Sequence, residues 1–112
     1  MVKQILTAAG FIEGETFKET RFLRPPKSTY AVYHDSVNRR GADNLNCITE
    51  HNVSIELYSQ APDPDAESRI EASIDQIGRP FTKDERYWIE SEQLYQVVYT
   101  LNYINKEVIC HE

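Results

Sequence analysis

The sequence predicts an α+β fold: an antiparallel or mixed sheet of four or more strands with two helices packed on one face. Several segments alternate apolar and polar residues with period two, as strands do, and two others repeat apolar residues at helical spacing. The length of 112 residues leaves room for one hydrophobic core, and no repeat or linker interrupts it. We therefore expect a single α+β domain over residues 1–112.

The first part of the chain is predicted to hold a short helix and an irregular arm. Val2, Ile5 and Leu6 fall at helical spacing, and Gly10 follows where a helix C-cap is expected. Residues 11–28 mix charges with scattered aromatic residues and contain a proline pair. This composition is typical of an arm or a short edge strand.

A hairpin is predicted next. Residues 30–35 alternate with period two, residues 38–44 form a polar loop, and a second strand covers residues 47–59. We expect the odd residues 51–57 of the second strand to face the core. Tyr33 and Tyr58 are predicted to lie on the strand faces opposite the core.

The clearest helix is predicted to begin after Asp63, a natural N-cap followed by a proline. Its apolar stripe runs from Ala66 to Ile77, and its other sides, which include Glu67, are expected to face water. Gly78 and a later proline end the helix.

Two strands are predicted to close the chain. The first covers residues 81–89 and the second residues 93–105, with a turn at residues 90–92. The second strand has the strongest alternation in the sequence, so we expect its odd residues 95–103 to face the helices.

The overall composition argues against several classes of protein. The chain carries 12 basic and 18 acidic side chains, a formal charge of −6, whereas nucleic-acid-binding modules are normally basic. It has no apolar run of the roughly 20 residues that cross a bilayer, and no signal peptide is recognisable. We therefore expect a protein made in the cytosol, without a membrane partner, whose two cysteines stay reduced.

No motif predicts chemistry. Cys47 and His51 would lie about 13 Å apart on one strand, too far to share a metal ion. No serine stands in a Gly-x-Ser-x-Gly elbow, and no glycine-rich phosphate loop is present. The acidic pairs Asp84–Glu85 and Glu90/Glu92 are more simply explained as a solvated hairpin end than as acid–base pairs. The sequence therefore predicts no enzyme, no cofactor and no metal site.

Five segments, in their order and spacing, resemble a known family. They are PPKSTYAVY at residues 25–33, GADN at 41–44, VSIELY at 53–58, DPDAESRIE at 63–71 and WIESEQLYQVVY at 88–99. Together they resemble small structural proteins of long-tailed bacteriophages and prophages: tail-completion or tail-terminator (head-to-tail joining) proteins. The resemblance extends over nearly the whole chain.

The resemblance implies a homo-oligomer, usually a hexameric ring, that caps the tail tube and presents a surface to the head connector. Its partners would be copies of itself, the tail tube protein and the connector proteins, and DNA would pass through its channel without specific binding. It would lie at the tail–head junction of the virion, after assembly in the bacterial cytoplasm. A neck or head-closure ring protein and a non-viral protein-binding module remain as alternatives.

The predicted contacts between copies lie on the arm at residues 11–26, the loop at 38–44 and the hairpin at 84–92. The candidate interface residues are Arg39, Arg40, Asp43, Asn44, Tyr58, Asp84, Glu85, Glu90 and Glu92. Residues 1–56 carry seven basic and seven acidic side chains, so residues 57–112, with five and eleven, carry the whole negative charge. We expect the acidic helix 63–77 or the 84–92 hairpin to line or rim the channel and repel DNA.

Overall fold

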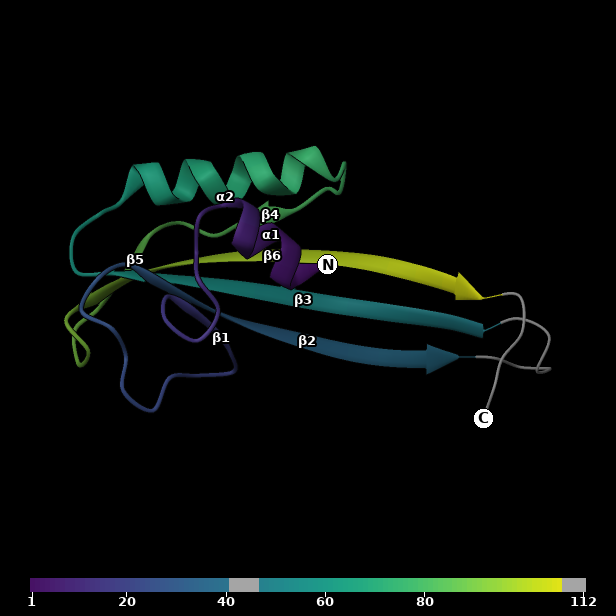
Figure 1. The fold of residues 1–112 in the computed structure, drawn as a ribbon, viewed down its shortest axis with the longest axis horizontal. Coiled ribbons are helices and arrows are strands. Elements are labelled where there is room, and N and C mark those ends of the chain that lie inside the picture. Colours follow the sequence, from purple (N-terminus) through teal and green to yellow (C-terminus); the bar gives the residue numbers. More distant parts are fainter. Residues whose placement is uncertain (41–46, 108–112) are drawn as a thin grey trace.

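Two helices lie on one face of a six-stranded mixed sheet, which confirms the predicted α+β fold (Figure 1). The computed structural model describes residues 1–40 and 47–107, and only the backbone at residues 39, 40, 47 and 105–107. No helix in these described ranges is long and apolar enough to cross a membrane.

Helix α2 (Pro64–Gln76) forms as its sequence predicts. The Asp63 side chain accepts a hydrogen bond of 3.1 Å from the backbone N–H of Ala66, and Pro64 occupies the first turn. Ala66, Ile70 and Ile74 of the apolar stripe are fully buried. Ile77 was wrongly included in this stripe, because it is the C-cap residue and is 38% exposed.

Helix α1 (Val2–Ala8) has seven residues and depends on α2 for its stability. The Arg69 guanidinium donates a hydrogen bond of 2.9 Å to the carbonyl oxygen of Ala9, and the Ser73 hydroxyl donates one of 2.8 Å to that of Ile5. The chain leaves α1 through Gly10, whose φ of +95° is one that glycine adopts readily. These contacts hold the two helices side by side.

The sheet is built around three long antiparallel strands. They are β2 (Tyr30–Arg40), β3 (Cys47–Ser59) and β6 (Leu94–Glu107), with β3 in the middle. Three short strands pair at their edges: β1 (Phe17–Glu19) parallel to β2, and β4 (Thr82–Lys83) and β5 (Tyr87–Ile89) antiparallel to β6.

The core lies between the helices and the odd-numbered residues of the long strands. In one row across the sheet, Tyr33 pairs with Ile55 and Ile55 pairs with Tyr99, and all three are buried. The predicted core faces of β3 and β6 are thus confirmed. Tyr33 was wrongly expected on the opposite face; it lies on the helix side, with its ring centroid 6.3 Å from that of Phe17.

The predicted loop at residues 38–44 begins too early. Residues 38–40 continue β2 and pair with residues 48–50 of β3. Their polar sequence resembles a loop because no helix covers this part of the sheet, so the strand needs no apolar face there.

The predicted strand over residues 81–89 is instead two short strands with a break between them. Lys83 and Arg86 both reach the carboxylate of Glu67, although residues three apart on a regular strand point to opposite faces. The chain therefore leaves regular strand geometry between them. The expectation that Glu67 faces water was also wrong, since it is only 6% exposed.

The helices cover only part of the sheet. A strand of 13 residues such as β3 is about 43 Å long, whereas the 13 residues of α2 span about 20 Å. Figure 1 shows β2, β3 and β6 continuing beyond the helices. We call residues 34–40, 47–53 and 101–107 of these strands the ribbon.

Candidate assembly interface

The outer edge of β2 is paired along only part of its length. The Ala31 N–H donates to the carbonyl oxygen of Thr16, and the Tyr33 carbonyl accepts from the N–H of Thr20, each at 2.9 Å. Outward-pointing backbone groups recur every second residue, so the next ones belong to Asp35 and Val37. No strand among the described residues pairs with β2 on this side beyond Tyr33.

The outer edge of β6 repeats this arrangement. The Asp84 N–H donates a hydrogen bond of 2.9 Å to the carbonyl oxygen of Val98, and β4 pairs with β6 as far as Thr100. The next outward backbone groups are those of Asn102 and Ile104, and within the described ranges no strand meets them. Among the described residues, the ribbon therefore has two unpaired edges of equal length, residues 34–40 and 101–107, which we call the free edges.

On the helix side of the ribbon, polar groups lie at the end of the core. The Nδ1 atom of His51 lies 3.0 and 3.1 Å from the two carboxylate oxygens of Asp35. The same imidazole stacks on the Tyr103 ring, with centroids 4.4 Å apart and planes 4° from parallel. In the same row, Val37 pairs with His51 and is 54% exposed, so the core ends at the His51 row.

The face of the sheet away from the helices, which we call the open face, carries the even-numbered residues of the long strands. From Tyr30 to Asn38, Glu50 to Tyr58 and Leu94 to Ile104, these positions hold no lysine or arginine. Their charged groups are the carboxylates of Glu50 and Glu56, and His34 lies 3.6 Å from Glu56. The open face is thus mostly neutral, with two acidic side chains.

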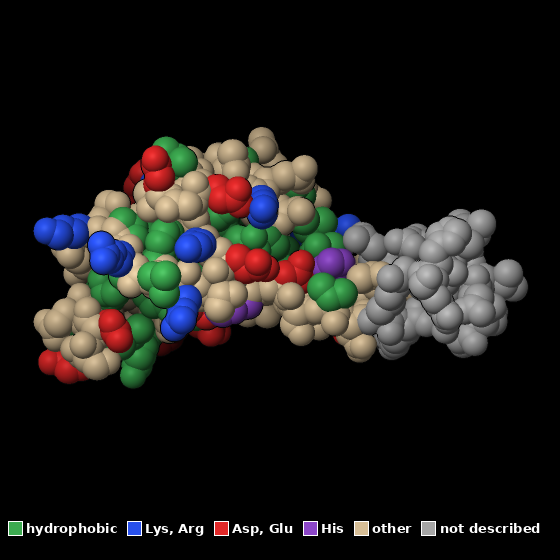
Figure 2. All heavy atoms as spheres, turned by 60° about the horizontal axis from the view of Figure 1, so that its bottom comes forward, with side chains coloured by type: hydrophobic (Ala, Val, Ile, Leu, Met, Phe, Trp, Pro, Cys, Tyr) green, Lys and Arg blue, Asp and Glu red, His purple; other side chains and the backbone are tan. Residues whose placement is uncertain are grey.

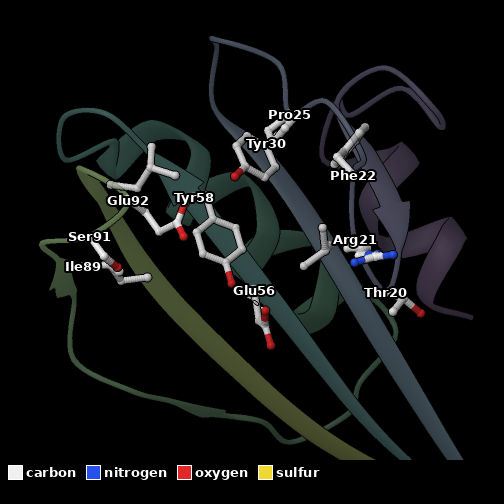
Figure 3. A pocket seen from close by; sticks show the side chains of 12 residues that line it. Thr20, Arg21, Phe22, Pro25, Tyr30, Glu56, Tyr58, Ile89, Ser91 and Glu92 are labelled. Atoms are coloured by element: carbon white, nitrogen blue, oxygen red, sulfur yellow. Dashed lines mark hydrogen bonds between the residues drawn. The ribbon is translucent and has the colours of Figure 1, made fainter.

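A cavity of about 390 Å³ lies on the open face, at the end away from the ribbon (Figure 3). The Tyr30 and Tyr58 rings stack in it with centroids 5.2 Å apart, and Phe22 of the arm meets Tyr30 edge-on at 5.5 Å. The turn between β5 and β6 forms the opposite wall with Ile89 and Glu92.

Polar side chains that line this cavity include Arg21, Glu56, Glu92 and the Tyr58 hydroxyl. The Tyr58 hydroxyl makes two hydrogen bonds. It donates a hydrogen bond of 2.6 Å to Glu56 and accepts one of 2.9 Å from the Gln96 amide. Burial, with the hydrogen bond to the Glu56 carboxylate, raises the pKa of Tyr58, so the hydroxyl stays protonated at neutral pH. The two hydrogen bonds hold the Tyr58 ring in place, and the protonated hydroxyl is not activated as a base or a nucleophile.

The two sides of the sheet carry opposite charges. On the β1–β2 side, residues 18–27 hold four exposed basic side chains, Lys18, Arg21, Arg24 and Lys27, and one acidic one, Glu19; we call this segment the basic arm, and Figure 2 shows Lys and Arg side chains on this side. On the β6 side, Asp84 and Glu85 are exposed between β4 and β5. The arm was predicted as a contact between copies, but its basic residues were not singled out, although their spacing of three residues is visible in the sequence.

The structure separates the predicted interface residues. Tyr58 and Glu92 line the same cavity, and Glu90 accepts a hydrogen bond of 2.6 Å from the Trp88 indole in the adjacent turn. Asp84 and Glu85 stand apart from them, along the β6 edge.

The two predicted arginines belong to the end of a strand. Arg39 and Arg40 are in β2, not in a loop, and pair with Thr49 and Ile48. Asp43 and Asn44 lie outside the described residues.

The carboxylates of α2 are largely paired. Glu67 lies 2.9 Å from Lys83 and 2.8 Å from Arg86, and Glu71 lies 2.8 Å from Lys83. Burial opposes ionisation of Glu67, but the hydrogen bonds from Lys83 and Arg86 outweigh it and lower the pKa of the carboxyl. Asp65 also pairs with Arg69, at 3.2 Å. The acidity of this helix is therefore mostly neutralised within the chain.

Comparison with known proteins adds no assignment. No family model matches the chain, and no curated protein matches it. In the part of the chain that the structure describes, no three His, Cys, Asp or Glu side chains are grouped so that they could hold a metal ion.

Proposed function

We propose that copies of this chain form a ring that caps the tail tube of a long-tailed bacteriophage or prophage and joins the tail to the head connector. The observation that carries the proposal is the opposite charge on the two sides of one small domain. The basic arm flanks β2, and Asp84 and Glu85 flank β6. Complementary patches on opposite sides favour head-to-tail contacts, which form a ring when the rotation from one copy to the next closes.

The sequence resemblance supplies the particle to which this ring belongs. It implies a hexamer whose partners are the tail tube protein and the connector, at the tail–head junction of the virion. The proposal contains no catalytic step and no cofactor.

The open face and the β5–β6 turn suit a channel through which DNA slides. Duplex DNA binds proteins chiefly through lysine and arginine contacts to its phosphates. The even-numbered strand positions 30–38, 50–58 and 94–104 have neither residue, although Arg21 of the arm lines the cavity on this face, and the turn adds the exposed carboxylates of Glu90 and Glu92. Since the α2 carboxylates are paired, this turn is the better candidate for the part of the chain that repels DNA.

Electron microscopy of particles made without this chain tests the proposal. We expect tails of irregular length that are not joined to heads, and we expect the chain supplied in trans to restore normal particles. Tails of normal length that stay unjoined would instead indicate a neck or head-closure ring. Normal, joined particles would overturn both assignments and leave the non-viral binding module.

Charge-reversal variants test whether the two oppositely charged sides meet. Reversing two arm charges, Arg21→Glu with Arg24→Glu, is expected to abolish complementation because it places acid against Asp84 and Glu85. Adding Asp84→Lys and Glu85→Lys to the same chain is expected to restore it. If the fourfold variant is as defective as the double one, although it folds, the two sides do not meet.

A further inference from the structure

We infer that neighbouring copies join by continuing the sheet: the free edge of β2 in one copy pairs with the free edge of β6 in the next. This inference rests on the proposed ring and specifies how its subunits meet. Residues 34–40 and 101–107 are the segments that would pair.

The backbone supports pairing at both edges. Free strand edges attract other strands, and monomeric proteins usually protect them with lysine, proline or a bulge. The outward positions Asp35, Val37 and Arg39 on β2, and Asn102 and Ile104 on β6, hold neither lysine nor proline, and the one outward lysine, Lys106, stands at the far end of β6. Val37 and Ile104 are each 54% exposed, which adds apolar area to both edges.

Strand direction identifies the occupant as a second copy in the same orientation. Both β2 and β6 are antiparallel to β3, so they run in the same direction. A copy placed alongside without being turned over therefore offers its β2 parallel to the β6 of its neighbour. This arrangement uses both edges of every copy, whereas a two-fold β2–β2 contact would leave each β6 edge free.

Charge complementarity supports the same placement. The basic arm lies beside β2, and Asp84 and Glu85 lie beside β6, both before the free edges begin. Parallel alignment of the two edges brings the arm of one copy toward the acidic segment of the next.

The expected diameter of a six-copy ring fits a channel for DNA. Six copies with three long strands each would close about 18 strands into a barrel. At a strand spacing of about 4.8 Å and a tilt of about 40°, the backbone diameter is about 35 Å, which leaves an opening of about 25 Å between side chains. That opening admits a DNA duplex. The helices lie on one face only, so the open face would line the channel.

Proline substitutions at the outward positions test the pairing. Val37→Pro and Asn102→Pro each remove an outward N–H without removing one from the sheet of the same chain, and edge strands tolerate proline at such positions. Supplied to cells that make particles without this chain, each variant is expected to weaken every junction at least about tenfold and to lose most joined particles. Val37→Thr and Asn102→Thr keep the N–H and are expected to complement normally.

Cross-linking gives a readout that does not depend on the proline variants folding. Ser36 and Asn102 lie on the open face at the two edges, so Ser36→Cys with Asn102→Cys, in a Cys47→Ser and Cys110→Ser background, is treated with a short bis-maleimide in isolated tails. We expect a ladder of linked chains up to the full ring. Either cysteine alone is expected to give no linked chains.

Each outcome decides one question. Linked dimers with Ser36→Cys alone would show β2–β2 pairing and overturn the inference. Tolerated prolines with no ladder would overturn it too, while the requirement for the chain in tail joining would leave the proposed function standing. Normal particles in the complete absence of the chain would instead overturn the proposed function.

Discussion

The two halves of the same three strands are built differently. In the half beneath the helices, Ile55 and Tyr99 are fully buried. In the ribbon, Val53, Leu101 and Tyr103 are still buried in the rows next to the helices, but Val37 and Ile104 are more than half exposed. The backbone ladder continues unchanged through both halves. A strand can therefore extend beyond its core while its side chains contribute little to stability, and such an extension is available to another chain.

The largest expected difference between the halves is in the loss of stability when an isoleucine is replaced by alanine. Ile55→Ala is expected to lower the free energy of unfolding by about 3 kcal/mol, because it leaves a cavity under the helices. Ile104→Ala, on the ribbon, is expected to cost less than about 0.5 kcal/mol. Urea unfolding of the two variants measures both. Equal losses would show that the ribbon is as well packed as the covered half.

The second largest effect on stability is expected at Glu67, whose buried carboxylate links α2 to the segment between β4 and β5. Glu67→Gln is expected to cost about 2 kcal/mol at pH 7, a moderate value because Lys83 and Arg86 are partly exposed. The folded pKa of Glu67 lies below its ordinary 4.5, so its contribution is complete above pH 4.5 and is lost as the pH falls through the folded value.

Unfolding measured from pH 7 down to pH 3 checks this expectation. The loss of stability on acidification should be smaller in Glu67→Gln than in the wild-type chain. The same dependence on pH in both chains would contradict the role assigned to the carboxylate.

A smaller effect is expected at the start of α2. Asp63→Ala removes the N-cap and the acceptor of a 2.7 Å hydrogen bond from Thr29, and it should cost about 1 kcal/mol. Asp65→Ala, in the same turn but 84% exposed at its side chain, is the matched control and should cost about 0.3 kcal/mol. Thermal unfolding of both variants separates capping from general acidity near the helix N-terminus.

The smallest effect is expected on the open face of the ribbon. His34→Ala removes a half-exposed side chain whose Nε2 lies 3.6 Å from Glu56, and should change the free energy of unfolding by less than about 0.5 kcal/mol. A loss above 1 kcal/mol in urea unfolding would show that the ribbon stabilises the isolated chain.

The parts of the fold with local signals could be predicted from the sequence. The Asp63–Pro64 pair and Gly78 mark the ends of α2, and the alternation in β3 and β6 determines which residues face the helices. Each of these signals depends on residues within a few positions of one another, so no knowledge of the tertiary structure is needed.

The parts that depend on distant partners could not be predicted. Glu67 is buried because Lys83 and Arg86, 16 and 19 positions later, compensate its charge. The side of the sheet that Tyr33 faces depends on Phe17 and the helices. Of the predicted interface residues, Tyr58 and Glu92 share a cavity, but the free edges are backbone features that follow only from strand pairing.

The shared direction of β2 and β6 makes any assembly closed through their edges polar. All copies would point the same way, so one side of the ring would present every β5–β6 turn, with Glu90 and Glu92, and the other side every ribbon end. A two-fold dimer has no such polarity. A ring with two chemically different sides can bind one partner on each, as a junction between a tube and a connector requires.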